Sequence, residues 1–363
     1  MNVYLLKKGL RSWGYWAKEI LMLMLIGLIP SSLMAELPIP LWPTPNEAFF
    51  KNMPLESYIQ PTASGKTESG LFGCVRNDGH RFHEGIDLKS VMKRDRRGEV
   101  TDEIKAAFSG QVKYVNKIGG NSSYGQYIII QHNQFDLPIH TLYAHLSTIF
   151  VKSGQDVKAG EVIGIMGRTS SNARIPKDRA HLHFEMGVQL SSTYFNSWYH
   201  QQKFPVPNQH GNWNGFNLVG FDPLDYCKQA TAHRFSSISG YIKSEPTAFC
   251  LRVITKNIPD FVRRYPSLLS KQFQGNIRGW DIEFTWYGLP KLWTPLFETD
   301  CPNLKEGTIL LLKYDAEIFK TKGNRKTIIK KNNKALTLGK NLKRFLCILL
   351  NLSEKQLHPS LKL

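Results

Sequence analysis

The sequence predicts a mainly β protein, with a compact antiparallel β-sheet domain followed by a smaller α/β C-terminal module of unknown type. Three observations support this prediction. Short strand-like runs rich in apolar residues follow one another, such as Gly110 to Val115 and Tyr127 to Gln131. Glycine, asparagine and serine turns separate the runs. The 363 residues also suffice for two domains of roughly 100 to 200 residues each.

The first 35 residues have the features of a secretory signal peptide. A basic leader from Lys7 to Lys18 precedes an apolar run from Ile20 to Ile29, and small residues lead to Ala35, after which we expect cleavage. The apolar run is shorter than the roughly 20 residues that span a bilayer. An uncleaved N-terminal membrane anchor is the alternative, because the charged leader is long. Either way, the protein is expected to be exported to the periplasm, cell envelope or extracellular space.

Residues 36–60 predict an extended, proline-rich linker. Proline recurs at positions 38, 40, 43 and 45, and it disfavours both helices and sheet ladders. We expect a first domain over residues 61–229 and a basic C-terminal domain of unknown function over residues 230–363.

The strand His181-Leu182-His183-Phe184-Glu185 is the most informative stretch of the sequence. Alternate residues of a strand project from one face, so His181 and His183 are expected side by side. Upstream, His83 and Asp87 are four residues apart and therefore on one side of an extended chain. Imidazole and carboxylate groups are ordinary zinc ligands. His145, taken alone, would more often be a core or edge histidine.

The segment from His83 to Asp87 also begins like the helical zinc motif His-Glu-x-x-His. Its last position is aspartate, however, and Gly85 would weaken a helix at its centre. Phe82, Ile86 and Leu88 share one parity, as residues on one face of a strand do. We therefore predict a strand.

In order along the chain, H-E-G-I-D (83–87), Y-G-x-Y-I-x-I-x-H (124–132), L-Y-A-H-L (142–146) and H-L-H-F-E (181–185) resemble the motifs of lysostaphin/LytM-type zinc metalloendopeptidases. These enzymes cut the peptide part of bacterial cell walls. The resemblance runs from about Phe72 to Met186 and includes a glycine-punctuated hairpin from Val157 to Gly164. It implies the compact β-fold known as the duplicated hybrid motif, with a metal groove across one sheet face.

Position by position, the resemblance implies that His83, Asp87 and His183 hold one zinc ion and that His145 and His181 are catalytic histidines outside the ligand set. Three protein ligands leave a fourth position open, as in catalytic zinc sites. The two other histidines would orient or deprotonate water and stabilise the oxyanion, and the sequence does not decide which does which. Glu185 is either a partner of a ligand histidine or a solvated or structural carboxylate.

Two segments depart from the family pattern. A polar, charged stretch from Lys89 to Glu103 takes the place of a short turn, and a long stretch from Ser170 to Arg179 precedes the histidine pair. Ala180 also stands where proline is common. Both stretches are expected to border the site and to influence substrate preference more than catalysis.

These assignments imply a secreted zinc metalloendopeptidase that hydrolyses peptidoglycan stem peptides or crosslinks. The alternative is a non-catalytic module on the same fold that binds the cell wall or activates another enzyme, although the intact ligand positions argue against it. A lipoyl-type carrier, suggested only by the hairpin from Val157 to Gly164, lacks an evidently displayed lysine.

Residues 230–363 contain no motif that indicates a function. Strands are expected at Phe284 to Tyr287 and Gly307 to Leu312, and the apolar run Phe345 to Leu352 is too short to span a membrane and is expected in a core. The net charge of +18 is concentrated partly in Lys313 to Arg344. For an exported protein this favours anionic wall polymers or a membrane surface as partners, with a solvated lysine face as the alternative, and no nucleic acid is expected.

The five cysteines are too scattered for a zinc-finger spacing. Their odd number leaves at least one thiol over in an oxidising compartment, and the sequence does not reveal any pairing.

Overall fold

The computed structural model describes residues 37–361 except 92, 172–173 and 332–334, so the expected signal peptide lies outside the described residues. From Leu37 onward the chain forms one compact unit. Within its described part, no helix has the length and hydrophobicity needed to cross a membrane.

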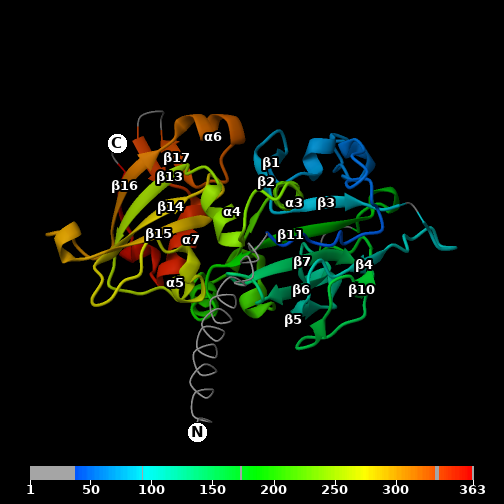
Figure 1. Cartoon of the computed structure of the whole chain (residues 1–363), viewed down its shortest axis with the longest axis horizontal. Coiled ribbons are helices and arrows are strands. Elements are labelled where there is room, and N and C mark those ends of the chain that lie inside the picture. The colour runs from blue at the N-terminus through cyan, green and yellow to red at the C-terminus, as the bar shows by residue number, and fades with distance from the viewer. Residues whose placement is uncertain (1–36, 92, 172–173, 332–334, 362–363) are drawn as a thin grey trace, which may run out of the picture. The chain divides into compact units, whose positions relative to one another are not determined.

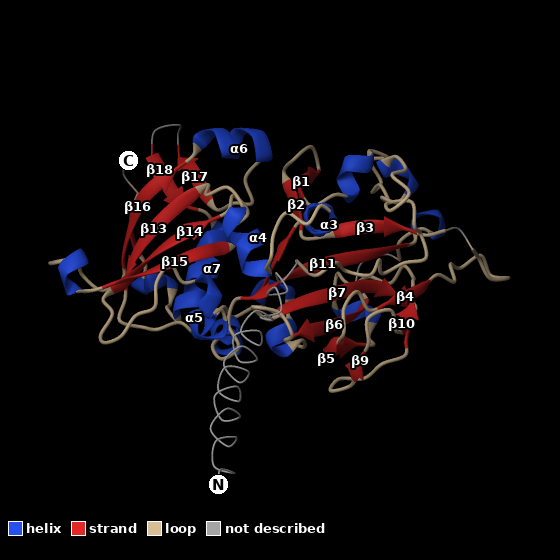
Figure 2. Ribbon diagram, in the orientation of Figure 1, coloured by secondary structure: helices blue, strands red, loops and turns tan. Residues whose placement is uncertain are grey.

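The predicted mainly β architecture is confirmed, and its largest element is a seven-stranded antiparallel sheet (Figures 1 and 2). The order is β12-β11-β7-β6-β5-β9, and β3 also pairs with β11. The strands are β3 (Ile86–Lys89), β5 (Gly110–Asn116), β6 (Gln126–His132), β7 (Ile139–Leu146), β9 (Asp156–Val157), β11 (His181–Gln189) and β12 (Leu218–Phe221). The central strands β6, β7 and β11 are almost wholly buried, which makes them rigid supports.

Two smaller sheets complete this half of the structure. A hairpin joins β1 (Gly73–Arg76) to β2 (Arg81–His83), and β10 (Val162–Ile165) lies between β4 (Glu103–Lys105) and β8 (Thr148–Ile149). The expected hairpin from Val157 to Gly164 is wrong, because β9 pairs with β5 whereas β10 pairs with β4 and β8. The glycine turn carries the chain from one sheet to the next.

A second, five-stranded sheet lies in the C-terminal half, in the order β15-β14-β13-β16-β19. Its strands are β13 (Phe249–Ile254), β14 (Gly279–Phe284), β15 (Pro290–Leu296), β16 (Thr308–Tyr314) and β19 (His358–Ser360), and a hairpin of β17 (Ile328–Lys331) and β18 (Ala335–Leu338) follows β16. The strand expected at Gly307 to Leu312 is confirmed by β16. The strand expected at Phe284 to Tyr287 is wrong beyond Phe284, since the next three residues form the turn into β15.

The helices are short, and three of the six named here are capped by side chains. They are α2 (Phe195–Gln201), α3 (Pro223–Thr231), α4 (Ile238–Ser244), α5 (Asp260–Arg264), α6 (Ala316–Lys322) and α7 (Lys340–Leu350). Asp222, Ser237 and Asp315 accept hydrogen bonds from the first turns of α3, α4 and α6. The apolar run from Phe345 lies in α7 and is buried up to Leu350, which confirms its expected place in a core.

Single turns of 3-10 helix fill many of the connections. They lie at Leu55–Ser57, Thr67–Gly70, Gly119–Asn121, Lys177–Arg179, Gly211–Trp213, Gly215–Asn217, Pro266–Leu268, Glu298–Asp300 and Glu354–Gln356.

The proline-rich segment at residues 37–60 begins in an extended conformation but is packed against the first half of the structure. The Leu41 amide donates to the Ala107 carbonyl at 2.9 Å. Trp42 is buried and stacks on Phe49 with ring centroids 4.8 Å apart. This segment therefore belongs to the same compact unit as the sheets.

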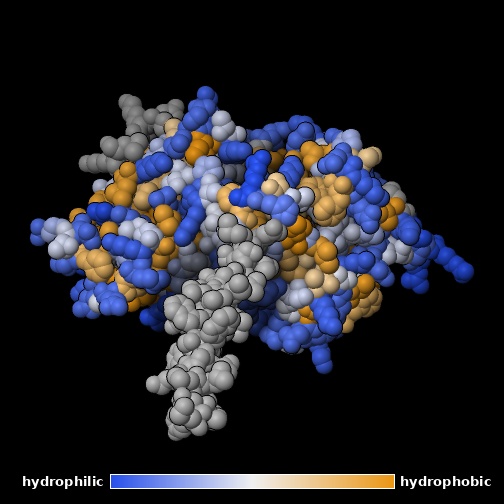
Figure 3. Space-filling view, in the orientation of Figure 1, coloured by the Kyte–Doolittle hydropathy of each residue, from blue (hydrophilic) through white to orange (hydrophobic). Residues whose placement is uncertain are grey.

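The two halves share one hydrophobic core. The same cluster of buried residues contains Phe184 of β11, Trp280 of β14 and Phe345 of α7. Polar contacts also cross between the halves, as where the Arg264 guanidinium donates to the Gln189 carbonyl at 2.9 Å. The boundary expected at residue 230 therefore falls inside a continuously packed unit. On the face seen in Figure 3, hydrophilic and apolar side chains are interspersed over both halves.

Candidate metal centre

Strand β11 positions the central residues of the site. Its neighbours are β7 on one side and β3 on the other, and all nine of its residues are buried. His183 is the direct partner of Asp87 in β3 and of Ala144 in β7. His181, His183 and Glu185 alternate along the strand and so lie on one face.

Gly85 explains how His83 and Asp87 both reach this face. A Cβ atom at position 85 would lie 2.2 Å from the Phe184 carbonyl oxygen of β11. Only glycine lets the chain cross β11 this closely as it leaves β2 and enters β3. His83 ends β2 and Asp87 lies in β3, so the crossing brings both side chains to His183.

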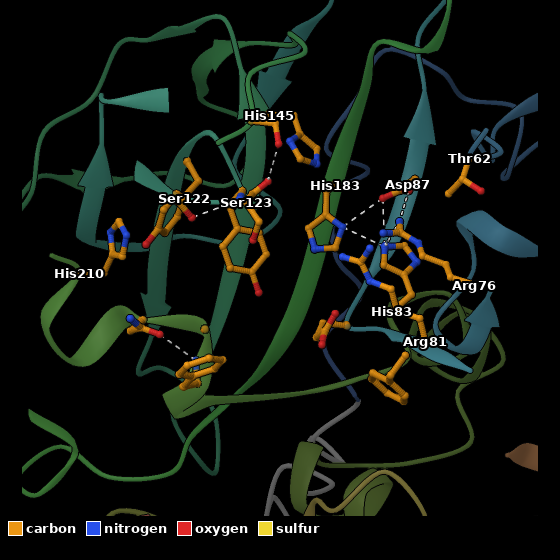
Figure 4. A pocket seen from close by; sticks show the side chains of 18 of the residues that line it. Thr62, Arg76, Arg81, His83, Asp87, Ser122, Ser123, His145, His183 and His210 are labelled. Carbon is orange, nitrogen blue, oxygen red and sulfur yellow. Dashed lines mark hydrogen bonds and ion pairs between the residues drawn. The ribbon is translucent and has the colours of Figure 1, made fainter. Parts of the chain in front are cut away.

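The ligand atoms of His83, Asp87 and His183 converge. The distances are 3.0 Å from His83 Nε2 to His183 Nδ1, 3.1 Å from His83 Nε2 to Asp87 Oδ1, and 3.1 Å from His183 Nδ1 to Asp87 Oδ1. Ligands about 2.0–2.1 Å from a tetrahedral zinc ion are about 3.4 Å apart, so a small change in spacing would accommodate the ion. Figure 4 shows the three side chains pointing toward one another.

The outer nitrogen of each ligand histidine is held by an acceptor. His83 Nδ1 lies 2.8 Å from the Leu71 carbonyl oxygen, and His183 Nε2 lies 2.8 Å from Glu185 Oε1. A carbonyl and a carboxylate only accept hydrogen bonds, so the outer nitrogens donate, and the inner nitrogens would be the ligand atoms when a metal ion replaces their contacts with Asp87. Of the two alternatives for Glu185, its contact fits that of a partner to a ligand histidine. The donor set and its supports therefore fit zinc.

Arg76 of β1 supplies a positive charge beside these atoms. Its Nη2 donates to His83 Nε2 at 2.8 Å and to a carboxylate oxygen of Asp87. Burial raises the pKa of Asp87, but interactions with His83, His181 and Arg76 outweigh it and hold that pKa well below its usual range. Asp87 is therefore ionised, as a carboxylate ligand must be.

The other two histidines lie at the edge of the cluster. The ring centroids of His145 and His181 are 4.9 Å apart, and His181 Nε2 is 3.6 Å from Asp87 Oδ1. Their Nδ1 atoms lie 2.8 Å and 2.7 Å from the carbonyl oxygens of Thr169 and Arg179, so these nitrogens donate. Burial lowers the pKa of both histidines. Each Nε2 is therefore unprotonated and can accept a proton.

His145 also has an unusual backbone. Its φ of 61° lies in the left-handed region, which non-glycine residues rarely adopt. Its amide donates to the Tyr124 carbonyl at 2.8 Å, which fixes this conformation at the end of β7. Backbone strain of this kind is often found at functional sites.

The five predicted site residues line one cavity of about 1100 Å³. Of the two segments that depart from the family pattern, Ser170 to Arg179 contributes to its lining, whereas the described residues of the stretch from Lys89 to Glu103 do not. The stretch from Lys89 to Glu103 instead contacts the stretch from Ser170 to Arg179, where Arg94 Nη1 donates to the Lys177 carbonyl at 3.0 Å. The expectation that both stretches border the site is thus correct for one of them.

Basic side chains outnumber acidic ones by eight to two among the described residues that line the cavity. The basic residues are Arg76, Arg81, Arg174, Arg179, Arg325, Lys326, Lys340 and Arg344, and the acidic residues are Glu84 and Asp87.

Several lining residues were not identified from the sequence. Arg76 reaches the cluster only because β1 pairs with β2, which no local pattern reveals. Tyr124 lies 5.5 Å from His183 between ring centroids, although its place at the start of a matched motif was a usable signal. His210 lines the cavity and is hydrogen-bonded to Tyr114.

Comparison with known proteins gives a family match over part of the chain. Residues 81–196 match the model described as Peptidase family M23. The "Lipoprotein NlpD/LppB homolog" of Pseudomonas aeruginosa is 32% identical over 119 residues, which are 33% of each chain. The "Murein hydrolase activator NlpD" of Salmonella dublin is 38% identical over 137 residues, covering 37% of this chain and 33% of that protein. The matches thus span about a third of the length of these relatives.

Among solved structures, the catalytic domain of lysostaphin from Staphylococcus simulans aligns with 48% of this chain and 95% of that chain, at 22% identity and a TM-score of 0.29. The resemblance predicted from the four motifs is confirmed by the family match, which contains His83, Asp87, His145, His181 and His183.

Proposed function

We propose that this chain, whose residues 81–196 form a domain of Peptidase family M23, is an exported zinc metalloendopeptidase that hydrolyses peptide bonds in peptidoglycan. One observation carries the proposal: the inner atoms of His83, Asp87 and His183 converge to 3.0–3.1 Å beside two histidines that can accept protons. An inactive site, or a metal site that only stabilises the fold, would not require His145 and His181.

Each residue has a task in this chemistry. A bound zinc ion would acidify a water molecule and polarise the scissile carbonyl group. His181 or His145, through its free Nε2, accepts the proton of the attacking water and returns it to the departing amine. Between these two proton transfers, the protonated imidazole would stabilise the oxyanion of the tetrahedral intermediate. Glu185 keeps His183 oriented through its 2.8 Å hydrogen bond.

The names of the relatives support the cell envelope as the place of action. One relative is called a lipoprotein and another a murein hydrolase activator, which agrees with the export signal expected at residues 1–35. We propose peptidoglycan peptides as the substrate. The lysine- and arginine-rich stretch from Lys313 to Arg344 would favour anionic wall polymers or a membrane surface as further partners.

The second candidate is a non-catalytic module that binds the wall and activates another hydrolase. The name of the Salmonella dublin relative, a murein hydrolase activator, favours it. The two functions differ in whether this chain itself breaks a peptide bond.

The test is digestion of purified peptidoglycan by the full chain, with and without a chelator. Mass spectrometry of the soluble products should find new amino and carboxyl termini that disappear with the chelator and with His183→Ala. His200→Ala, an exposed histidine outside the cavity, is the matched control and should cleave normally. Wall binding without new termini, together with stimulation of an added murein hydrolase, would support the second candidate instead.

A further inference from the structure

One wall of the cavity comes from the C-terminal half of the chain. It consists of residues 324–326 and the first turn of α7, with Lys340, Asn341 and Arg344. The Asn341 amide nitrogen donates to the Lys326 carbonyl at 3.1 Å, and its side chain donates to the Arg325 carbonyl at 2.6 Å. These bonds tie the two pieces together, so the wall is a fixed part of the fold.

Arg325 is the most buried cation of this wall, with 4% of its surface exposed. Its guanidinium carbon lies 4.1 Å from the centre of the Phe82 ring, and Nη2 is 3.3 Å from Glu84 Oε1. Its Nη1 has no hydrogen-bond partner among the described residues. A buried guanidinium normally uses its donors, because an unpaired buried donor is destabilising.

Arg344 repeats this arrangement from α7. Its guanidinium carbon lies 4.8 Å from the Phe216 ring centre and 5.0 Å from the Phe345 ring centre, and its Nε has no partner among the described residues. Burial, followed by the charge of Arg325, lowers the pKa of Arg344 to about 9. The two guanidinium carbons lie 5.5 Å and 5.0 Å from the centre of the same Phe345 ring, and Glu84 is the only described acid that forms an ion pair with either group.

The start of α7 adds to this positive charge. The helix has no acidic residue in its first turn and no side-chain cap, yet it begins with Lys340 and has Lys343 and Arg344 close behind. A helix N-terminus carries partial positive charge and is stabilised by anions, not by cations. The sequence here is therefore unfavourable for the helix alone and favourable for an anion beside it.

We propose that Arg325 and Arg344 form a subsite that binds a carboxylate of an acidic peptide lying in the cavity. A guanidinium group presents planar, paired donors that match a carboxylate, and Arg325 and Arg344 both line the cavity. The inference rests on the proposed function, since the same peptide would extend to the zinc cluster.

The subsite is close enough to the cluster to contact the same peptide. Arg325 pairs with Glu84, the neighbour of His83 in the chain. Arg344 and Tyr124 line the same cavity, and the Tyr124 ring lies 5.5 Å from His183 between centroids. A bound carboxylate would thus fix the position of the peptide relative to the scissile bond, and the wall would set substrate preference.

The test measures binding of three synthetic stem pentapeptides to the full zinc-loaded chain by calorimetry. One peptide has free carboxyl groups, one is amidated at its glutamate carboxyl, and one is amidated at its C-terminus, and mass spectrometry confirms that each stays intact. One of the two amidations should weaken binding at least about tenfold, as expected for loss of a charged hydrogen-bonded pair. Arg344→Gln should bind the free peptide as weakly as the wild type binds that amidated one.

Matched variants separate this subsite from a general effect of charge. Arg263→Gln removes the same charge from an exposed position of α5 outside the cavity and should bind like the wild type. Arg344→Lys keeps the charge but loses the planar donors, so its preference for the free peptide over the amidated one should lie between those of the wild type and Arg344→Gln. The same variant tests the subsite if Arg344→Gln does not fold. Equal affinity of the wild type for all three peptides, or an equal loss in Arg263→Gln, would overturn the subsite.

The outcome also separates the two proposals. Cleavage of walls without any effect of amidation would count against the subsite alone. An amidation effect without chelator-sensitive cleavage would count against the peptidase activity alone. Failure of the wild type to bind any of the peptides would contradict both.

Discussion

Asp87 Oδ1 and His183 Nδ1 lie 3.1 Å apart, and the two residues face each other as direct partners in the β3–β11 register. Directly opposed residues of an antiparallel pair have Cβ atoms about 4.5–5.5 Å apart. The ligand atoms are therefore brought together by the sheet itself and need no loop closure. Five predictions follow from this rigid arrangement and its surroundings.

Removing a ligand should remove the metal. His183→Ala should lower bound zinc from about one ion per chain to less than about a tenth of that, because two ligands no longer complete a catalytic zinc site. Elemental analysis of the purified protein measures this directly. The exposed His200→Ala should retain its zinc, and full occupancy in His183→Ala would show that the ligand assignment is wrong.

The two histidines outside the ligand set should affect rate and not metal content. His145→Ala and His181→Ala should each retain zinc but lower kcat by roughly 10²–10⁴, the usual contribution of a general acid or base. Parallel measurement of zinc content and of wall-peptide release distinguishes them from the ligands. Loss of zinc in either variant would place that histidine in the ligand set.

Glu185→Gln should weaken zinc binding without removing a ligand. The amide no longer offers a charged acceptor to His183 Nε2, and loss of such a support costs roughly 10–100-fold in metal affinity. Competition with a chromogenic chelator gives the affinity. Glu103→Gln, an exposed change outside the cavity, should leave it unchanged, and unaltered affinity in Glu185→Gln would mean that this carboxylate is only structural.

Gly85→Ala should disrupt the site and the sheet together. Its Cβ atom would meet the Phe184 carbonyl oxygen at 2.2 Å, which forces β3 away from β11 and moves Asp87 from His183. We expect a lower melting temperature and loss of zinc. Gly120→Ala, where a Cβ atom has nothing within 4 Å and φ is not positive, should behave like the wild type, and a stable, zinc-loaded Gly85→Ala would contradict this account of the glycine.

Stability should fall on acidification partly because of His132, which lies away from the metal cluster. Burial lowers its pKa to about 4 from the ordinary 6.5, although the Ser109 carbonyl opposes the shift. The folded state thus favours neutral imidazole, so this contribution is complete above pH 6.5 and disappears as pH falls through 4. Its full size is about 3 kcal/mol.

Urea unfolding of the wild type and His132→Gln across this range checks the prediction. The slope of unfolding free energy against pH between 4 and 6.5 should be smaller in the variant, by up to about 1.4 kcal/mol per pH unit. His200→Gln should have the slope of the wild type. Equal slopes in His132→Gln and the wild type would mean that His132 protonates without cost.

The sequence predicted the parts of the site that depend on local pattern. The alternation of His181 and His183 and the spacing of His83 and Asp87 place side chains on a strand face, and that geometry follows from the backbone alone. The local pattern does not show which strand or turn, distant in the sequence, lies next to each predicted strand. Arg76, Arg325 and Arg344 reach the cavity through long-range packing and were therefore not identified.

The strand expected at Phe284 to Tyr287 and the hairpin expected from Val157 to Gly164 were wrong for the same reason, because long-range packing decides both. Trp286 and Tyr287 resemble strand residues because they are aromatic, but they pack across the two halves, 5.7 Å from Phe82 and 5.1 Å from Phe72 between ring centroids. These two aromatic residues therefore serve packing between the two halves and do not pair with a neighbouring strand. Val157 and Ile163 are likewise both buried, yet they belong to different sheets.

The alternation along β11 has a consequence for folding. Its other face carries Leu182, Phe184 and Met186, all in the core. A shift of one residue in its pairing would turn the imidazoles into the core and these three apolar side chains into the cavity. A chain with this strand out of register would therefore lose its core and the His83–Asp87–His183 cluster at once, so correct pairing of β11 is a condition for both.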